Sequence, residues 1–305
     1  MKTHFGRLLA LALAMALQSQ LAAGQQIPDP EFNTTVAQPA YKKSYPRVVF
    51  DEAHNNFHTT TGRYKPFVDL ISSDGYNVVP GRKLFAKPTL STFKILVIAN
   101  ALGAEDMDED GADRSAFTEE ECDVVRDWVK GGGSLLLIAD HAPFGAAAES
   151  LGKRFGVEMS KGYTFDPEND FAVSRPSTLL FSRENKRLLD HPITNGRNVG
   201  ERINRVITFT GQSLKGPEGS SVILLLSQTV RDKPDRESQT SVSAAGRAQG
   251  IAFKFGKGRV VVLGEAAMLS AQLAGAERGP MGMNVPGSDN RQLALNIMHW
   301  LSGSL

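Results

Sequence analysis

Cysteine is almost absent from this sequence, with Cys122 alone among 305 residues. A single cysteine excludes an intramolecular disulfide. Cys122 stands in the acidic run Glu119-Glu120-Glu121-Cys122-Asp123, and neighbouring carboxylates raise the pKa of a thiol, which disfavours the reactive thiolate. We therefore interpret Cys122 as a buried helix residue and not as a nucleophile.

An excess of either charge is also lacking. The chain has 34 Lys and Arg residues against 33 Asp and Glu residues, a formal net charge of +1. Removing the leader described next, which carries Lys2 and Arg7, lowers that charge by two, to −1. A near-neutral chain offers no electrostatic attraction to nucleic acid or to an anionic membrane surface, so we expect neither as a partner.

No apolar run reaches the roughly 18 residues that a transmembrane helix needs. The run Leu8–Leu17 follows the basic Lys2 and Arg7 and precedes the small residues of Leu21-Ala22-Ala23-Gly24. This order is typical of a secretory signal peptide, which we predict over 1–24, with an N-terminal membrane anchor as the alternative. The leader contains no cysteine for lipid attachment. We expect a periplasmic or secreted protein without stable membrane insertion.

Strand and helix patterns alternate after a polar, proline-containing segment, 25–45, which we interpret as a linker. Thr118 with Glu121 forms the capping-box pattern of a helix start. Apolar runs and helical periodicity predict strands at 47–50, 76–79, 95–99 and 135–139, and helices at 64–73, 118–130 and 145–155. The order β-α-β-β-α-β-α predicts an α/β fold with a doubly wound, largely parallel sheet of the flavodoxin-like kind.

The C-terminal half is β-rich. Strands are predicted at 206–209, 222–226, 251–255 and 259–263, and a final helix at 290–301. Gly256-Lys257-Gly258 joins the last two strands in a hairpin signature. The charged stretch 231–249 is long for a structureless connection, and we predict an exposed excursion there, over a site. We predict a single domain over 46–303.

Polar residues gather where the predicted parallel strands end. In an open parallel sheet, ligands bind outside the carboxyl ends of the strands. That rule selects Asp51, Glu52, His54, Asn55, Asn56, His58, Asn100, Asp140, His141 and Glu265. Turn formation alone also places polar residues at strand ends, and this is the structural alternative to a site.

One chemical interpretation of this set is a divalent metal site. Imidazole and carboxylate ligands suit zinc, iron or manganese. The candidate ligands are Asp51, His54, His58, Asp140 and His141. The spacing of His54 and His58 would place both rings on one face of a helix, but Thr59-Thr60-Thr61-Gly62 favours a loop, and no HExxH motif is present.

The other interpretation is a hydrogen-bonding pocket for a small polar or carbohydrate-like ligand. His141 would act as a general base that Asp140 or Asp51 orients. Six further strand-end residues would bind the ligand: Glu52, His54, Asn55, His58, Asn100 and Glu265. A Ser-His-Asp triad has weak support, because Ser270 follows a strand without a Gly-x-Ser-x-Gly elbow.

Over 46–303 the sequence resembles the class I glutamine amidotransferase-like superfamily. The segments that carry the resemblance are Val48-Val49-Phe50-Asp51-Glu52-Ala53-His54-Asn55-Asn56, Gly132-Gly133-Ser134-Leu135-Leu136-Leu137-Ile138-Ala139-Asp140-His141, His191-Pro192-Ile193-Thr194 and Asp289-Asn290-Arg291-Gln292-Leu293-Ala294-Leu295-Asn296-Ile297. The sequence is most similar to the bacterial DUF4350-like branch, which is related to a domain of intraflagellar transport and gliding-motility proteins.

The same resemblance removes one activity. Amidotransferases of this kind carry a nucleophilic cysteine on the turn after the strand that here ends at Ala139. This sequence has Asp140-His141-Ala142-Pro143-Phe144 there, and Cys122 lies one helix earlier. Glutamine hydrolysis by the usual route is therefore not expected, and the fold alone does not supply another activity.

Three functional hypotheses remain open. The first is an exported domain that binds a small polar or carbohydrate-like ligand at the strand ends. The second is a hydrolase, with or without a divalent metal, that uses Asp51, His54, Asp140 and His141. The third is a protein-interaction module of an envelope assembly, because related domains occur in multiprotein assemblies.

Overall fold

The computed structural model describes residues 26–43, 45–172 and 174–305, so the predicted signal peptide, 1–24, lies outside the described residues. Within them the chain forms a nine-stranded sheet. Eight strands follow one another in the order β3 (Asn77–Gly81), β2 (Arg47–Asp51), β4 (Ile95–Ala99), β5 (Ser134–Ile138), β15 (Gly258–Leu263), β14 (Ala248–Phe255), β10 (Leu214–Lys215) and β6 (Glu158–Met159). The ninth strand, β11 (Ser221–Leu225), also pairs with β14.

The sheet is mixed in direction. Strands β3, β2, β4, β5 and β15 run parallel to one another, which confirms the predicted parallel core. From β14 onward the pairing is antiparallel. The β14–β15 pair is the predicted Gly-Lys-Gly hairpin, with Phe255 opposite Gly258. The antiparallel part comes mainly from the β-rich C-terminal half.

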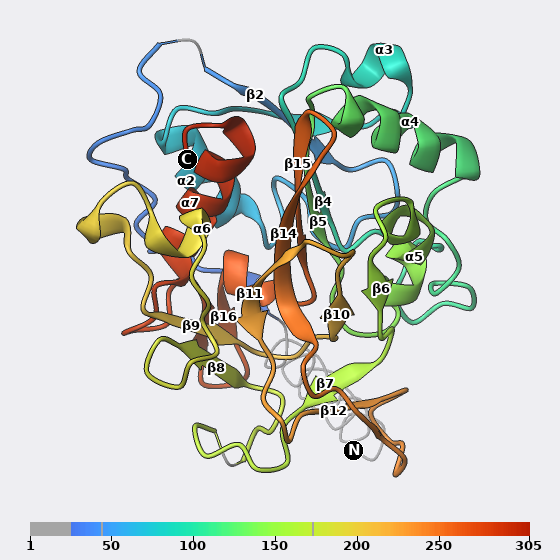
Figure 1. The fold of residues 1–305 in the computed structure, drawn as a ribbon, viewed down its shortest axis with the longest axis vertical. Coiled ribbons are helices and arrows are strands. Elements are labelled where there is room, and N and C mark those ends of the chain that lie inside the picture. Colours follow the sequence, from blue (N-terminus) through green and yellow to red (C-terminus); the bar gives the residue numbers. More distant parts are fainter. Residues whose placement is uncertain (1–25, 44, 173) are drawn as a thin grey trace, which may run out of the picture.

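Helices pack against both faces of the sheet, because successive residues of a strand point to opposite sides. Phe50 of β2 belongs to one apolar cluster, whereas its neighbour Val49 belongs to the other. The first cluster includes α2 (Lys65–Ser73) and α7 (Asn290–Ser302), and the second includes α4 (Glu119–Lys130) and α5 (Phe144–Arg154). Figure 1 shows these two pairs of helices on opposite sides of β14 and β15.

Local signals set where helix α4 begins. The Thr118 hydroxyl accepts a hydrogen bond from the backbone N–H of Glu121, and the Glu121 carboxylate accepts one from the backbone N–H of Thr118. The predicted capping box is therefore confirmed. Cys122 is fully buried in this helix, as predicted. The short helices of the described residues are α3 (Lys87–Leu90), α6 (Pro192–Asn195), η1 (Val199–Glu201) and η2 (Ala267–Leu269).

Three smaller sheets accompany the main one within the described part of the chain. They are β1 (Ile27–Pro28), β16 (Ala271–Ala274) and β17 (Gly279–Gly282); β13 (Val242–Ser243), β12 (Arg231–Lys233) and β7 (Tyr163–Phe165); and β8 (Leu179–Ser182) with β9 (Arg205–Thr208). The predicted strand at 206–209 forms as β9 but pairs with β8, outside the main sheet. The predicted excursion, 231–249, contains β12 and β13 and is partly regular.

The described part of the predicted linker lies against the domain. Strand β1 pairs with β16, and the backbone N–H of Ala40 donates to the Asp74 carboxylate at 2.8 Å. Phe32, Val36 and Tyr41 pack against the core. Segment 26–43 is therefore attached to the domain surface. Across the described residues, no helix combines the length and the apolar character that crossing a bilayer requires.

Candidate functional site

The carboxyl ends of β4, β5 and β15 lie beside a cavity of about 280 Å³. Five of the predicted strand-end residues line it: His58, Asn100, Asp140, His141 and Glu265. The sequence reasoning did not select its other polar lining residues, which are Gln26, Arg63, Thr210, Arg236 and Gln272. Parallel strands bring the first group together because their carboxyl ends share one edge of the sheet.

Asp140 and Glu265 form a buried pair of carboxyls. Asp140 accepts hydrogen bonds from the backbone N–H groups of His141, at 2.7 Å, and Ala266, at 3.3 Å. Glu265 accepts from those of Ala267 and Met268, at 2.7 and 2.8 Å. Burial raises the pKa of both carboxyls, and the Asp140 charge raises the pKa of Glu265 further, to well above its ordinary value. The pair therefore retains a proton at pH values where a free glutamate has lost it.

Asn100 ties three strand-end segments together. Its side-chain carbonyl accepts the backbone N–H of Asp140 at 3.0 Å, and its backbone carbonyl accepts that of Phe57 at 2.9 Å. Its φ of 54° lies in the left-handed region, which asparagine tolerates better than most residues do. Asn100 thus connects the end of β4 to the end of β5 and to the loop after β2.

His141 has a defined tautomer. Its Nδ1 donates to the backbone carbonyl of Ala142 at 2.7 Å, so in the neutral ring Nε2 carries the lone pair. The ring stacks on Tyr163 of β7, with centroids 4.5 Å apart and planes 19° apart. Packing and a hydrogen bond therefore hold the ring in place at the cavity wall.

Two buried polar atoms in the lining have no hydrogen-bond partner among the described residues. One is Nδ1 of His58, and the other is Oε1 of Gln272, whose amide group donates to Ser270 at 2.6 Å. The His58 ring stacks on Tyr64 at 4.6 Å. Burial, followed by the nearby charge of Arg63, lowers the pKa of His58 to about 3. His58 is therefore neutral at physiological pH.

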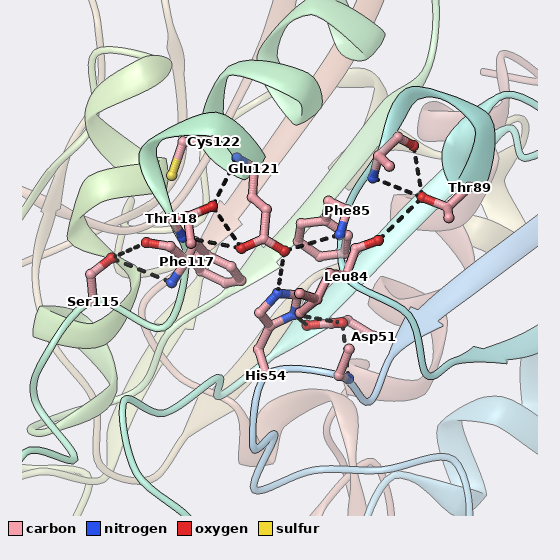
Figure 2. A network of polar contacts seen from close by, with 12 residues as sticks. Asp51, His54, Leu84, Phe85, Thr89, Ser115, Phe117, Thr118, Glu121 and Cys122 are labelled. Atoms are coloured by element: carbon pink, nitrogen blue, oxygen red, sulfur yellow. Dashed lines mark hydrogen bonds and ion pairs between the residues drawn. The ribbon is translucent and has the colours of Figure 1, made fainter.

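Asp51 and His54 form a second polar centre (Figure 2), and neither residue lines this cavity. His54 Nδ1 lies 2.9 Å from both carboxylate oxygens of Asp51, and its Nε2 lies 3.0 Å from Glu121 Oε1. The ring is held between Phe85, at 4.5 Å, and Phe117, at 4.8 Å. Burial alone would lower the pKa of His54, but Asp51 and Glu121 outweigh burial and the pKa is raised.

These contacts correct the expectation that Asp51, His54, Asp140 and His141 form one centre. Both nitrogens of His54 already face carboxylates, so the ring has no nitrogen left for a ligand. Glu52 accepts hydrogen bonds from Thr60. The strand-end residues selected from the sequence therefore include some that line the cavity and others that hold the adjoining loop. Asp51, Glu52 and His54 belong to the second kind, and Asn55 is exposed and does not line the cavity. The loop predicted around His54 and His58 is confirmed, because no helix forms there.

The five metal-ligand candidates do not converge. Over the ranges that the structure describes, no group of three or more His, Cys, Asp and Glu side chains is arranged to hold a metal ion. Asp51 and His54 pair with each other, whereas His58, Asp140 and His141 lie at the cavity without forming such a group. The residues present do not fit a divalent metal, and we derive no chemistry through one.

The sequence contained a signal for some, but not all, of the site residues that the strand-end rule did not select. Glu121 was selected as a capping residue, but no local pattern links it to His54, 67 positions earlier. Arg236 lies in the excursion predicted to cover a site, and it does line the cavity. Arg63 and Gln272 do not stand directly after a strand of the parallel core, so the strand-end rule could not select them.

No protein-family model and no curated protein matches this sequence. Among solved structures, the chain is similar to the mmIFT52 N-terminal domain, with a TM-score of 0.58 and 12% identity over 84% of this chain and 97% of that one. It is also similar to a cytoplasmic protein from Salmonella typhimurium, with a TM-score of 0.50 and 11% identity over 84% and 98%. A weaker likeness, with a TM-score of 0.45 and 12% identity over 90% and 95%, is to a ThuA-like protein from Bacteroides uniformis.

The likeness to the mmIFT52 domain is consistent with the class I glutamine amidotransferase-like fold expected from the sequence. At such low identity the likeness concerns the fold alone. The turn where that superfamily is expected to carry its nucleophile holds Asp140 and His141 here, and the buried Cys122 is on α4. Any chemistry of this chain must therefore be argued from its own cavity.

Proposed function

We propose that the protein binds a small hydroxyl-rich ligand, of the sugar or polyol class, in the strand-end cavity. The observation that carries this proposal is the buried pair Asp140 and Glu265 in the wall of a cavity. Its lining also includes Gln272 and His58, each of which has a buried polar atom without a partner among the described residues. A carboxyl that retains a proton donates one hydrogen bond and accepts others. A hydroxyl group also donates one hydrogen bond and accepts others, so a carboxyl and a ligand hydroxyl can each serve as donor and acceptor for the other.

The apolar part of the lining supports the same ligand class. Phe57 and Phe144 lie at the cavity with ring centroids 5.4 Å apart, and Met107 and Met281 line it as well. Such surfaces contact the C–H groups of a sugar ring while polar atoms bind its hydroxyls. The volume of about 280 Å³ favours a compact ligand over an extended chain.

The proposal includes the finer assignments made from the sequence. These are a doubly wound arrangement of the DUF4350-like branch and export to the periplasm or the medium. Helices on both faces of the parallel strands support the first assignment, and the basic and apolar leader supports the second. N-terminal sequencing of the protein recovered from an extracytoplasmic fraction would test export, and recovery in the cytoplasm with Met1 intact would contradict it.

Calorimetric titration of the purified protein with hexoses, hexitols and hexuronic acids tests the binding proposal. We expect at least one class to bind, and Asp140→Asn or Glu265→Gln to weaken binding by about tenfold or more, since each replaces a carboxyl that would hydrogen-bond the ligand's hydroxyls. The control is Asp232→Asn, because Asp232 is a buried, hydrogen-bonded carboxylate outside the cavity. Absence of binding by every probe, or binding that survives both cavity substitutions, would overturn the proposal.

The geometry of His141 supports a second candidate function, a hydrolase that uses neither Asp51 nor His54. His141 Nε2 is available as a general base, and a protonated Glu265 supplies the complementary acid at the same cavity. Hydrolysis of a panel of chromogenic glycosides and esters tests it. We expect His141→Gln to lower kcat with little change in KM, and turnover that is unchanged in this variant would reject the role.

A further inference from the structure

Arg63 is a half-buried cation at the cavity wall without an anionic partner in the described part of the chain. Its guanidinium lies over the Phe57 ring at 4.5 Å, and its Nη1 donates one long hydrogen bond, of 3.4 Å, to the Gln26 side chain. Burial lowers the pKa of Arg63, with no carboxylate contribution to offset it. A guanidinium has five N–H donors in a planar fork, so Arg63 has further donors available to a ligand.

The unpartnered atoms of the lining independently indicate a ligand. His58 and Gln272 are 3% and 1% exposed, and each has a buried polar atom without a partner within the described residues. A buried polar atom that lacks its hydrogen bond costs about 1–3 kcal/mol. His58 lies close enough to Arg63 for the arginine charge to affect its pKa. A ligand that binds Arg63 therefore lies near His58, a residue with an unsatisfied polar atom.

A second cation reaches the cavity from a distant part of the sequence. Arg236, on the excursion that carries β12 and β13, is exposed and lies over the Tyr163 ring at 5.2 Å. The two buried carboxyls of the cavity, Asp140 and Glu265, retain part of their protons. Two guanidinium groups therefore stand at the cavity beside carboxyls that retain part of their protons, so the lining can accept a negatively charged occupant.

We propose that the ligand is a sugar acid, whose carboxylate pairs with the Arg63 guanidinium while its hydroxyls bind the Asp140–Glu265 pair, Gln272 and His58. A guanidinium matches a carboxylate with two parallel hydrogen bonds, which a neutral sugar cannot form. This inference rests on the proposed function and narrows it from hydroxylated ligands to anionic hydroxylated ligands.

The test compares sugars that differ at C6, where a uronate has a carboxylate and its neutral partner has a hydroxymethyl group. Calorimetric titrations of the whole mature protein use glucuronate against glucose and galacturonate against galactose, with acetate and inorganic phosphate as anions that lack a sugar ring. We expect a uronate to bind about tenfold or more tightly than its neutral partner, as expected for one charge-assisted pair. The preference should shrink as salt concentration rises, because salt screens the pairing of charges.

The variants separate the anion contact from folding. Arg63→Met keeps an apolar stem over Phe57 and removes the charge, so it should abolish the preference for the uronate over its neutral partner. Arg47→Met is the matched control, because Arg47 also lies over a phenylalanine, Phe93, at 4.5 Å but at the opposite end of β2 from the cavity. The control should change neither affinity.

Each outcome separates this inference from the proposed function. Neutral sugars that bind as tightly as the uronates, or a preference that survives Arg63→Met, overturn the sugar-acid inference and leave sugar binding standing. Binding of acetate or phosphate alone, dependent on Arg63, overturns the sugar class and leaves only an anion site. Absence of binding by all probes overturns both proposals.

Discussion

The Nε2 atom of His54 lies 3.0 Å from Oε1 of Glu121, a residue 67 positions further along the chain. This contact joins the loop after β2 to the start of α4, and Asp51 holds the opposite side of the same ring. Glu121 also accepts the backbone N–H groups of Phe85 and Thr118. His54, which the sequence suggested as a ligand-binding residue, therefore fastens the loop after β2 to α4. That loop places His58 and Arg63 at the cavity wall.

Replacing His54 with glutamine should destabilise the fold without acting directly on the cavity. The change leaves the buried carboxylates of Asp51 and Glu121 without their shared partner, at a cost of about 2–4 kcal/mol in the free energy of unfolding. Chemical denaturation measures the loss. In a double-mutant cycle with Glu121→Gln, the two losses should sum to more than the loss of the double variant, and strict additivity would contradict the pairing.

The same contact predicts how stability depends on pH. The pKa of His54 is raised, so its contribution is complete below the unfolded value of 6.5 and is lost as pH rises through the folded pKa. The pKa of Glu121 is lowered, so its contribution is complete above the unfolded value of 4.5 and is lost as pH falls through the folded pKa.

Denaturation curves should therefore show that the difference in stability between the native protein and His54→Gln is greatest between pH 4.5 and 6.5. Taking the difference between the two proteins removes the opposing effect of His58, which stays neutral in the fold down to about pH 3. A difference that grows steadily above pH 6.5 would have the wrong sign for a raised pKa.

Asp140 should control the protonation of Glu265. The charge of Asp140 is the second cause, after burial, of the raised pKa of Glu265. Asp140→Asn removes that charge, so the pKa of Glu265 should fall toward its ordinary value while remaining above it, because the burial persists. Carbon-13 NMR of the glutamate carboxyl during a pH titration measures the shift. An unchanged pKa would show that burial alone holds the proton.

Cys122 should be inert to thiol reagents in the folded protein. Its side chain is fully buried in α4, and burial raises the pKa of the thiol, so both access and thiolate formation are disfavoured. Labelling with a chromogenic disulfide reagent should be complete in denaturant, where all chains react. It should be slower by about a hundredfold or more under native conditions, if reaction requires unfolding. Fast native labelling would contradict the buried placement.

Local patterns were enough to predict most elements of the parallel core. Runs of apolar residues predicted β2, β4 and β5, because a strand that is buried on both faces has apolar residues at successive positions. The capping box of α4 is likewise a contact between neighbours in the sequence. The pairing of β9 with β8 was not predictable, because strand propensity does not name a partner strand.

For the site, the sequence by itself determined which residues stand at the strand ends, because the order of strands and helices fixes that edge of a parallel sheet. It therefore selected Asn100, Asp140, His141 and Glu265 correctly as neighbours of one cavity. Only the tertiary structure decided that His54 pairs with Glu121 and that Arg63 stands at the cavity wall. Those placements depend on contacts between distant segments, and chain direction and hydrophobic period carry no information about such contacts.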